Sequence, residues 1–441
     1  TTGTSPFGGG GRTPSRGAAP ELSVEHWTRW WYPNRRHIIS WSSRVTAVNA
    51  RDTTPGGEAA RGDADRFRAE AHDDTDRTVW VADRFRAEVQ LALHDALRSP
   101  NEDLASGAAV ALGKLGDPAD TAPLARLLAD SARLQPVREA AAIALGLLPV
   151  RGDAAADGRR ALEAVAEDDR EPERLRAVAV YALGLRGELA SLPVLMDLAH
   201  GGGASWDVPT AAVGALGIAG HDLIQPDLVE LLQGPRRGRG DEFMRRSYAA
   251  QALSRFPLPS TLDALRAAAI DDDVDVRRSA ALALGTTAGA DDDATMDLLA
   301  RLVARDRDDT VQSAAAISIG RIGHPRGEAA LRLAYLKGGT KLRPFAALAL
   351  GLYARHDGHA DAADLICRDL AETSNAEERA ALAIAAGLSG NRDAAATLRD
   401  IVANRGDPAL RGHAALALGL LDDRPVDGPL LRELLVDVRD P

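Results

Sequence analysis

A short pattern close to Ala-Leu-Gly recurs ten times along this chain of 441 residues. Its glycine, replaced by serine in the fifth copy, stands at positions 113, 146, 184, 217, 254, 285, 320, 351, 387 and 419. The nine gaps between positions 113 and 419 average 34 residues, a period typical of helical solenoids. A repeat of this size cannot bury its apolar face alone, so successive repeats must stack to build one continuous core.

Each repeat divides into two predicted helices. The alanine-rich segment that carries the recurring glycine, such as "DVRRSAALALG", is the second helix of its pair. Its Gly285 either ends the helix or lets a neighbouring helix approach closely. Amphipathic segments such as "TAPLARLLADS" and "TMDLLARLVA" supply the first helices, and no stretch alternates as a strand does. We therefore predict an all-α fold, an α-solenoid of about ten helix pairs over residues 81–441.

The recurring segments, among them "RRSAALALGTTAG" and "RGHAALALGLLDD", resemble the HEAT-repeat family in its phycobilisome-lyase-like variant, whose pattern is similar to VRxxAAxALGxxG. This resemblance covers about residues 83–441. It implies an α-solenoid that presents surfaces to protein partners. It also implies a ladder of Asp and Arg side chains between the starts of the second helices, where Arg138, Arg176, Arg245, Arg277, Arg379 and Arg411 stand.

The first 80 residues divide by composition into three segments. Residues 1–22 are rich in Gly, Pro, Ser and Thr, which predicts a flexible tail, and residues 51–80 form a polar linker. Between them, residues 23–50 hold Trp27, Trp30, Trp31 and Trp41, four of the six tryptophans in the chain.

The first three of these tryptophans stand at i, i+3 and i+4, on one face of a short helix that Ser23 caps and Pro33 ends. We expect this aromatic face to cover the open start of the first repeat. A docking surface for another subunit or for the cell envelope is the alternative. Trp41 belongs to the same candidate partner-binding segment.

Trp27, Trp30, Trp31 and Asn34 match a WxxWWxxN-like helix, so this region resembles exported HEAT-repeat proteins of planctomycete-type bacteria. The resemblance implies an extracytoplasmic or secreted protein whose signal peptide has been removed. The chain starts at Thr1 without Met, which fits either a removed signal peptide or a shortened chain. A cytoplasmic location is the alternative.

The net charge and the hydropathy of the chain limit the classes of partner that we expect it to bind. The formal net charge of −11 argues against wholesale binding to nucleic acid, and no apolar run approaches the roughly 20 residues that span a bilayer. Arg236, Arg237 and Arg239 concentrate positive charge in "GPRRGRGDEFMRR". This turn is either a solvated loop, a site for an acidic protein partner or, least in keeping with the acidic chain, a nucleic-acid contact.

The residue types that carry chemistry are scattered. Cys367 is the only cysteine, which excludes an internal disulfide and a cysteine-built zinc site, and we expect it to be packed in a helix. The nearest pair of histidines, His356 and His359, falls in a predicted turn. Acidic runs such as "DDDVD" lack the Gly and Glu of a calcium loop and precede helices, so we expect them to cap helix N-termini. We expect no catalytic residues, no metal and no cofactor.

The chain ends in "GPLLRELLVDVRDP", which predicts a first helix without the second helix of its pair. This helix either caps the stack or leaves a face that receives another subunit. We interpret the protein as a non-catalytic scaffold for protein–protein interaction, with protein partners that include a second copy of itself in an end-to-end oligomer or filament. The alternative is an enzyme-associated HEAT protein, either bilin lyase-like or acting on nucleic acid.

Overall fold

The computed structural model describes residues 75–149, 152–201, 207–234, 242–356, 360–404, 406–421 and 424–436. Within these ranges the chain forms twenty-one α-helices, α3 to α23, four short 3-10 turns and no strand. The prediction of an all-α fold is confirmed. No helix in the described ranges combines the length and hydropathy required to cross a bilayer.

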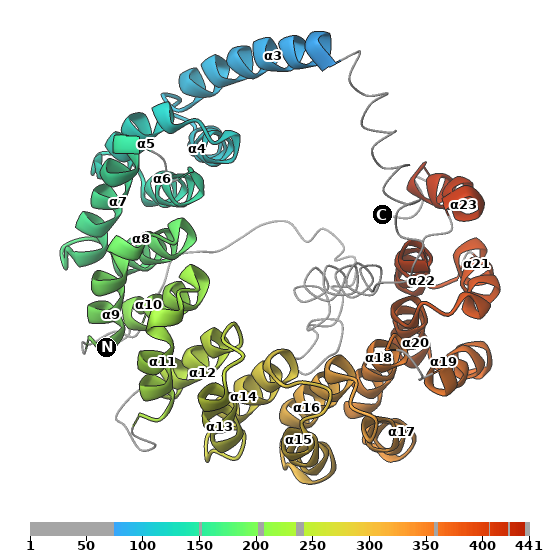
Figure 1. Cartoon of the computed structure of the whole chain (residues 1–441). Coiled ribbons are helices and arrows are strands. Elements are labelled where there is room, and N and C mark those ends of the chain that lie inside the picture. The colour runs from blue at the N-terminus through green and yellow to red at the C-terminus, as the bar shows by residue number, and fades with distance from the viewer. Residues whose placement is uncertain are drawn as a thin grey trace, which may run out of the picture.

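The helices lie in two layers around an open ring (Figure 1). The ten helices that carry the recurring pattern line the inside: α4 (Glu102–Leu115), α6 (Gln135–Leu147), α8 (Glu173–Arg186), α10 (Asp207–Ala219), α12 (Glu242–Leu253), α14 (Val274–Thr287), α16 (Asp309–Ile322), α18 (Leu342–Ala354), α20 (Ala376–Ser389) and α22 (Pro408–Leu421). The amphipathic helices form the outer layer: α3 (Thr75–Ala96), α5 (Thr121–Ala129), α7 (Gly152–Glu167), α9 (Leu192–His200), α11 (Gln225–Leu232), α13 (Pro259–Ala268), α15 (Asp293–Arg305), α17 (Gly327–Lys337), α19 (Ala360–Glu372), α21 (Ala395–Ala403) and α23 (Arg424–Val436).

The recurring glycine lies where one inner helix meets the next. A methyl group on Gly146 would lie 2.9 Å from Cα of Ala182, and one on Gly184 would lie 2.6 Å from Cα of Ala215. The same close approach recurs at Gly113, Gly217, Gly285, Gly320, Gly351 and Gly387. The residue that each glycine meets stands two positions before the next recurring glycine, which explains the Ala-Leu-Gly order. The glycine therefore admits a neighbouring helix, and of the two roles that the sequence allowed this is the one observed.

A different glycine ends several inner helices. Gly187 and Gly323, the last residue of ALGxxG in their repeats, have φ angles of 61° and 69° and cap α8 and α16 in the left-handed conformation. This conformation favours glycine because a Cβ is strained there. The two glycines of the motif thus have separate functions, one in packing between repeats and one in ending the helix.

The small residues of the inner layer also explain the curvature. Each inner helix packs extensively on the next, whereas the outer helices contact one another far less. Because Ala and Gly let the inner helices approach closely and the bulkier outer layer is spread apart, the stack bends toward its inner layer (Figure 1). One apolar cluster runs through it from Leu97 to Leu421, so the predicted continuous core is present.

At the ends of the described array, α3 begins at Thr75 and α23 is the last described helix. The predicted tail, the tryptophan segment and most of the predicted linker lie outside the described residues.

Candidate interaction surfaces

The residues chosen from the sequence as partner-binding candidates lie outside the described residues. These are Trp27, Trp30, Trp31 and Trp41 near the N-terminus, and Arg236, Arg237 and Arg239 in the turn between α11 and α12. They therefore remain predictions.

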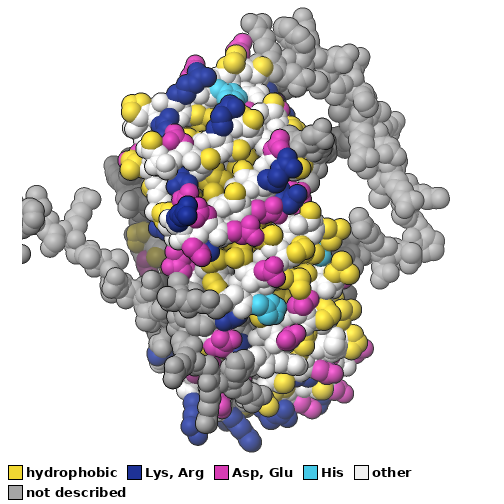
Figure 2. All heavy atoms as spheres, turned by 90° about the vertical axis from the view of Figure 1, so that its left-hand side faces the viewer, with side chains coloured by type: hydrophobic (Ala, Val, Ile, Leu, Met, Phe, Trp, Pro, Cys, Tyr) yellow, Lys and Arg dark blue, Asp and Glu magenta, His cyan; other side chains and the backbone are white. Residues whose placement is uncertain are grey.

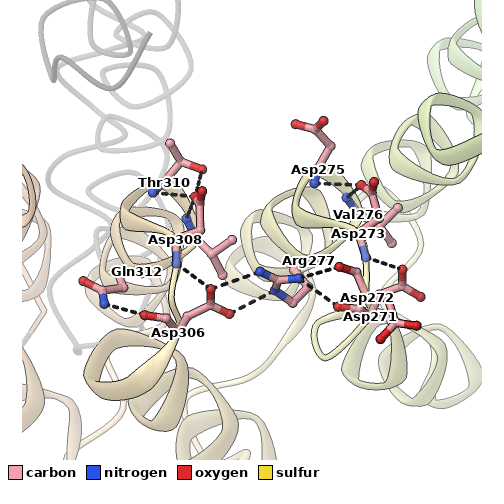
Figure 3. Close-up of polar contacts among 11 residues, drawn as sticks. Asp271, Asp272, Asp273, Asp275, Val276, Arg277, Asp306, Asp308, Thr310 and Gln312 are labelled. Atoms are coloured by element: carbon pink, nitrogen blue, oxygen red, sulfur yellow. Dashed lines mark hydrogen bonds and ion pairs between the residues drawn. The ribbon is translucent and has the colours of Figure 1, made fainter. Parts of the chain in front are cut away.

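Acidic and basic side chains connect successive repeats on the described surface. Arg277 Nε and Nη2 donate to the two carboxylate oxygens of Asp306 at 3.0 and 3.2 Å, and its Nη1 donates to the carbonyls of Asp271 and Asp272 at 2.9 and 3.1 Å (Figure 3). A bidentate Arg–carboxylate contact fixes orientation as well as distance. Arg277 consequently holds the turn after α13 against the turn before α16.

The acidic runs cap helices, as the sequence predicted. The carboxylate of Asp273 accepts from the backbone N–H groups of Asp275 and Val276, and that of Asp308 accepts from Thr310 and Val311 (Figure 3). Burial alone would raise the pKa of Asp308, but the hydrogen bonds from Thr310 and Val311 outweigh it and the pKa is lowered. Asp308 is therefore ionised at neutral pH and stabilises the start of α16.

At other junctions between repeats, the predicted Asp–Arg ladder has Glu in place of Asp or an arginine at a neighbouring position. Arg138 Nε donates to the carbonyl of Leu128 at the end of α5, and its guanidinium pairs with Glu171 in the next repeat. Arg246, rather than the expected Arg245, donates to the carbonyl of Leu232 and pairs with Asp271. These arginines satisfy carbonyls at the ends of outer helices and hold adjacent repeats in register.

The single thiol has no sign of reactivity. Burial raises the pKa of Cys367 to about 11, with Asp393 and Asp364 adding to the effect, so the thiol is protonated at neutral pH. No group of three or more His, Cys, Asp or Glu side chains in the described ranges could hold a metal ion.

Among the described residues, the two ends of the inner layer lack the close contact that joins each recurring glycine inside the stack to an alanine, or to Ser318 in one case, of the next inner helix. A methyl group on Gly419 of α22 would meet no described atom within 4 Å, and Gly419 is exposed where its eight packed counterparts are buried. At the other end, Ala111 of α4 is half-buried, whereas the equivalent Ala144 in α6 is fully buried. At one end Gly419 is therefore exposed and has no described helix against it, and at the other end Ala111 is only half-buried.

A groove of about 620 Å³ crosses the inner layer from α8 to α16. Its lining contains two tyrosines, Tyr181 and Tyr248, and two arginines, Arg255 and Arg321, but no Asp, Glu or Lys among the described residues. Such a lining is unusual in a chain with a formal net charge of −11 and only 4% aromatic residues.

The tyrosines form one wall of this groove. The ring of Tyr181 lies over Gly214, where an added methyl group would be 3.1 Å from it, and its hydroxyl is hydrogen-bonded to Tyr248. Burial, followed by the neighbouring Tyr248, raises the pKa of Tyr181 to about 12. The two tyrosines lie on the inner helices α8 and α12, so their hydrogen bond joins two non-adjacent inner helices.

Hydroxyl and amide groups continue the lining. Gln251 Nε2 donates to Ser279 Oγ at 3.2 Å, and Thr286 Oγ1 donates to the carbonyl of Ala283 at 2.7 Å. Arg255 Nη1 donates to the carbonyl of Ile218 at 3.2 Å. Arg321 makes no hydrogen bond or ion pair with any described residue, and burial lowers its pKa. It is a partly buried cation without a counter-ion in the described part of the molecule.

A signal for this groove is visible in the sequence once the register is known. The residue after each recurring glycine is Leu or Ile in six copies, whereas the fifth, sixth and seventh copies have Arg255, Thr286 and Arg321. Sequence reasoning missed this row because it treated the copies as equivalent. Apolar side chains at equivalent positions on the inner helices α6, α8 and α10 are exposed to solvent: Ile143, Leu147, Leu185 and Ile218 are 38%, 40%, 46% and 36% exposed.

Figure 2 shows the side formed by the outer helices of the N-terminal half, where basic and acidic side chains are intermixed with apolar ones. On this side no single charge is concentrated, unlike in the lining of the inner groove.

Two layers of stacked helix pairs with a repeated Gly–Ala junction define the class of α-helical repeat proteins. The family model for HEAT repeats matches residues 76–146, 239–320 and 363–441, which together make up more than half of the chain. The chain belongs to the HEAT-repeat family. No curated protein sequence matches it.

Solved structures with similar folds come from proteins of different function. Human deoxyhypusine hydroxylase in complex with glycerol is 19% identical, with 63% of this chain and 99% of that chain covered and a TM-score of 0.29. Importin beta is 14% identical, with coverages of 80% and 57% and a TM-score of 0.48. The CpcE–CpcF complex of phycocyanin lyase from Nostoc sp. is 21% identical, with coverages of 56% and 92% and a TM-score of 0.38. At these identities the similarity concerns the fold alone.

Proposed function

We propose that this protein is a non-catalytic scaffold that binds proteins and assembles with itself end to end. The HEAT-repeat fold is consistent with a role in protein interaction. The proposal of self-assembly rests on one observation. At the ends of the inner layer Gly419 on α22 is exposed and Ala111 on α4 is half-buried, whereas their counterparts inside the stack are buried.

The end-to-end contact would extend the packing that already joins the repeats. Inside the molecule, a glycine such as Gly387 accepts the next helix with an added methyl group only 2.7 Å from Cα of Ala417. An equivalent surface at Gly419 has no helix against it in the described structure. Contacts of this head-to-tail kind are heterologous and generate rings or filaments.

Apolar side chains at both ends support the same proposal. Leu91 on α3 and Leu104 on α4 are 68% and 53% exposed, and Val426 on α23 is 55% exposed. The tryptophan segment, residues 23–50, is the part of the chain that we propose to bridge the two ends, because it holds four of the six tryptophans. Its Trp27, Trp30 and Trp31 would supply a bulky apolar face for that contact.

Light scattering at several protein concentrations tests this proposal. We expect the full chain to associate as concentration rises, and we expect both a chain lacking residues 1–41 and the Gly419→Leu variant to remain monomeric. A methyl group at Gly419 meets no described atom within 4 Å, so we expect the added leucine to interfere mainly with a helix from outside.

The matched control is Gly339→Leu, which adds the same bulk at a turn where a methyl group also meets no described atom. This variant should associate like the unmodified chain. A full chain that stays monomeric at every concentration, or a Gly419→Leu variant that associates normally, would refute the end-to-end contact.

A further inference from the structure

The cations of the inner groove are arranged unlike those elsewhere on the molecule. Arg277 and Arg246 each pair with a carboxylate of a neighbouring repeat. Arg321, which lines the groove from α16, has neither a hydrogen bond nor an ion pair within the described residues. A charge that is partly removed from water without a counter-ion costs free energy, and a ligand that supplies the opposite charge recovers it.

We propose that the groove between α8 and α16 binds an acidic peptide segment of a partner protein, whose carboxylates lie against Arg321 and Arg255. The proposal concerns a surface separate from the ends of the array and does not depend on self-assembly. Because no Asp or Glu lines the described groove, nothing in the lining repels an incoming carboxylate. Planar guanidinium groups suit the two oxygens of a carboxylate.

The rest of the lining suits a peptide. Gln251, Ser279 and Thr286 offer amide and hydroxyl groups to a peptide backbone, and the Tyr181 and Tyr248 rings offer flat apolar area. Ile218 is part of the lining, and the exposed Leu185, Leu147 and Ile143 lie on α8 and α6 at positions equivalent to lining residues. We therefore expect the segment to carry apolar residues beside its acidic ones.

Charge also distinguishes this ligand from nucleic acid. Affinity for a nucleic acid rests on many cations that follow its phosphates. Among the described residues two cations line the groove, Arg255 and Arg321, and the positions equivalent to them on α6, α8 and α10 expose Leu147, Leu185 and Ile218. Local positive charge within a surface of this kind favours a short acidic segment.

Selection from a displayed random peptide library, with the full chain as bait, tests the proposal. We expect the enriched peptides to combine Asp or Glu with apolar residues and to bind more weakly as salt is raised. Their affinity for Arg321→Gln should fall about tenfold or more, the loss expected for a charge-assisted hydrogen bond. Arg301→Gln is the matched control, because Arg301 is exposed on the outer helix α15 and its substitution removes the same charge.

Thermal unfolding separates loss of binding from loss of fold. Since Arg321 has no described partner, Arg321→Gln should keep or raise the melting temperature while binding falls. The proposal is overturned if no peptide is enriched, if the enriched peptides lack acidic residues, or if Arg301→Gln weakens binding equally. Displacement of the selected peptides by a single-stranded oligonucleotide would overturn it in favour of nucleic acid.

Discussion

Gly387 and Gly419 occupy equivalent positions in consecutive inner helices, yet their surroundings differ. An added methyl group at Gly387 would lie 2.7 Å from Cα of Ala417, whereas one at Gly419 would meet no described atom within 4 Å. We expect Gly387→Ala to destabilise the protein by roughly 1–3 kcal/mol, because α20 and α22 must move apart. Gly419→Ala should instead stabilise α22 by up to about 1 kcal/mol through helix propensity. Urea unfolding followed by circular dichroism measures both, and shifts of the same sign would contradict this account.

At the scale of single helices, capping aspartates make stability depend on pH. The pKa of Asp308 is lowered from its ordinary 3.8 because hydrogen bonds from Thr310 and Val311 outweigh the effect of burial. Its contribution is therefore fully present above the unfolded pKa and is lost as pH falls through the folded pKa. We expect Asp308→Asn, which keeps a capping oxygen but not the charge, to be less stable by about 0.3–1 kcal/mol at neutral pH. The difference in melting temperature should shrink as pH falls below about 4, and a constant difference would argue against a charge effect.

Element type and pairing could be predicted from the sequence because they depend on periodicity alone. The recurring pattern, with glycine in nine copies and Ser254 in the fifth, located all ten inner helices, and the amphipathic segments indicated their outer partners. The groove could not be predicted, because Tyr181 and Arg321, on α8 and α16, come to line one surface only after the stack has formed. Whether an arginine forms an ion pair likewise depends on the folded structure. Arg277 and Arg321 both lie on inner helices, but of these two only Arg277 pairs with a carboxylate of the described residues.

At the scale of the whole molecule, the extensive contacts among the described helices join neighbouring repeats: each inner helix packs on the next, and no helices of distant repeats pack extensively on one another. A defect at one junction should therefore remain local. At Gly285, an added methyl group would lie 2.7 Å from Cα of Ser318, so Gly285→Val must separate α14 from α16. We expect amide hydrogen exchange, measured by mass spectrometry, to accelerate in α12 to α18 and to stay unchanged in α4, α6 and α22. Equal acceleration in every repeat would show instead that the ring unfolds as a single cooperative unit, as a globular domain with one shared core does.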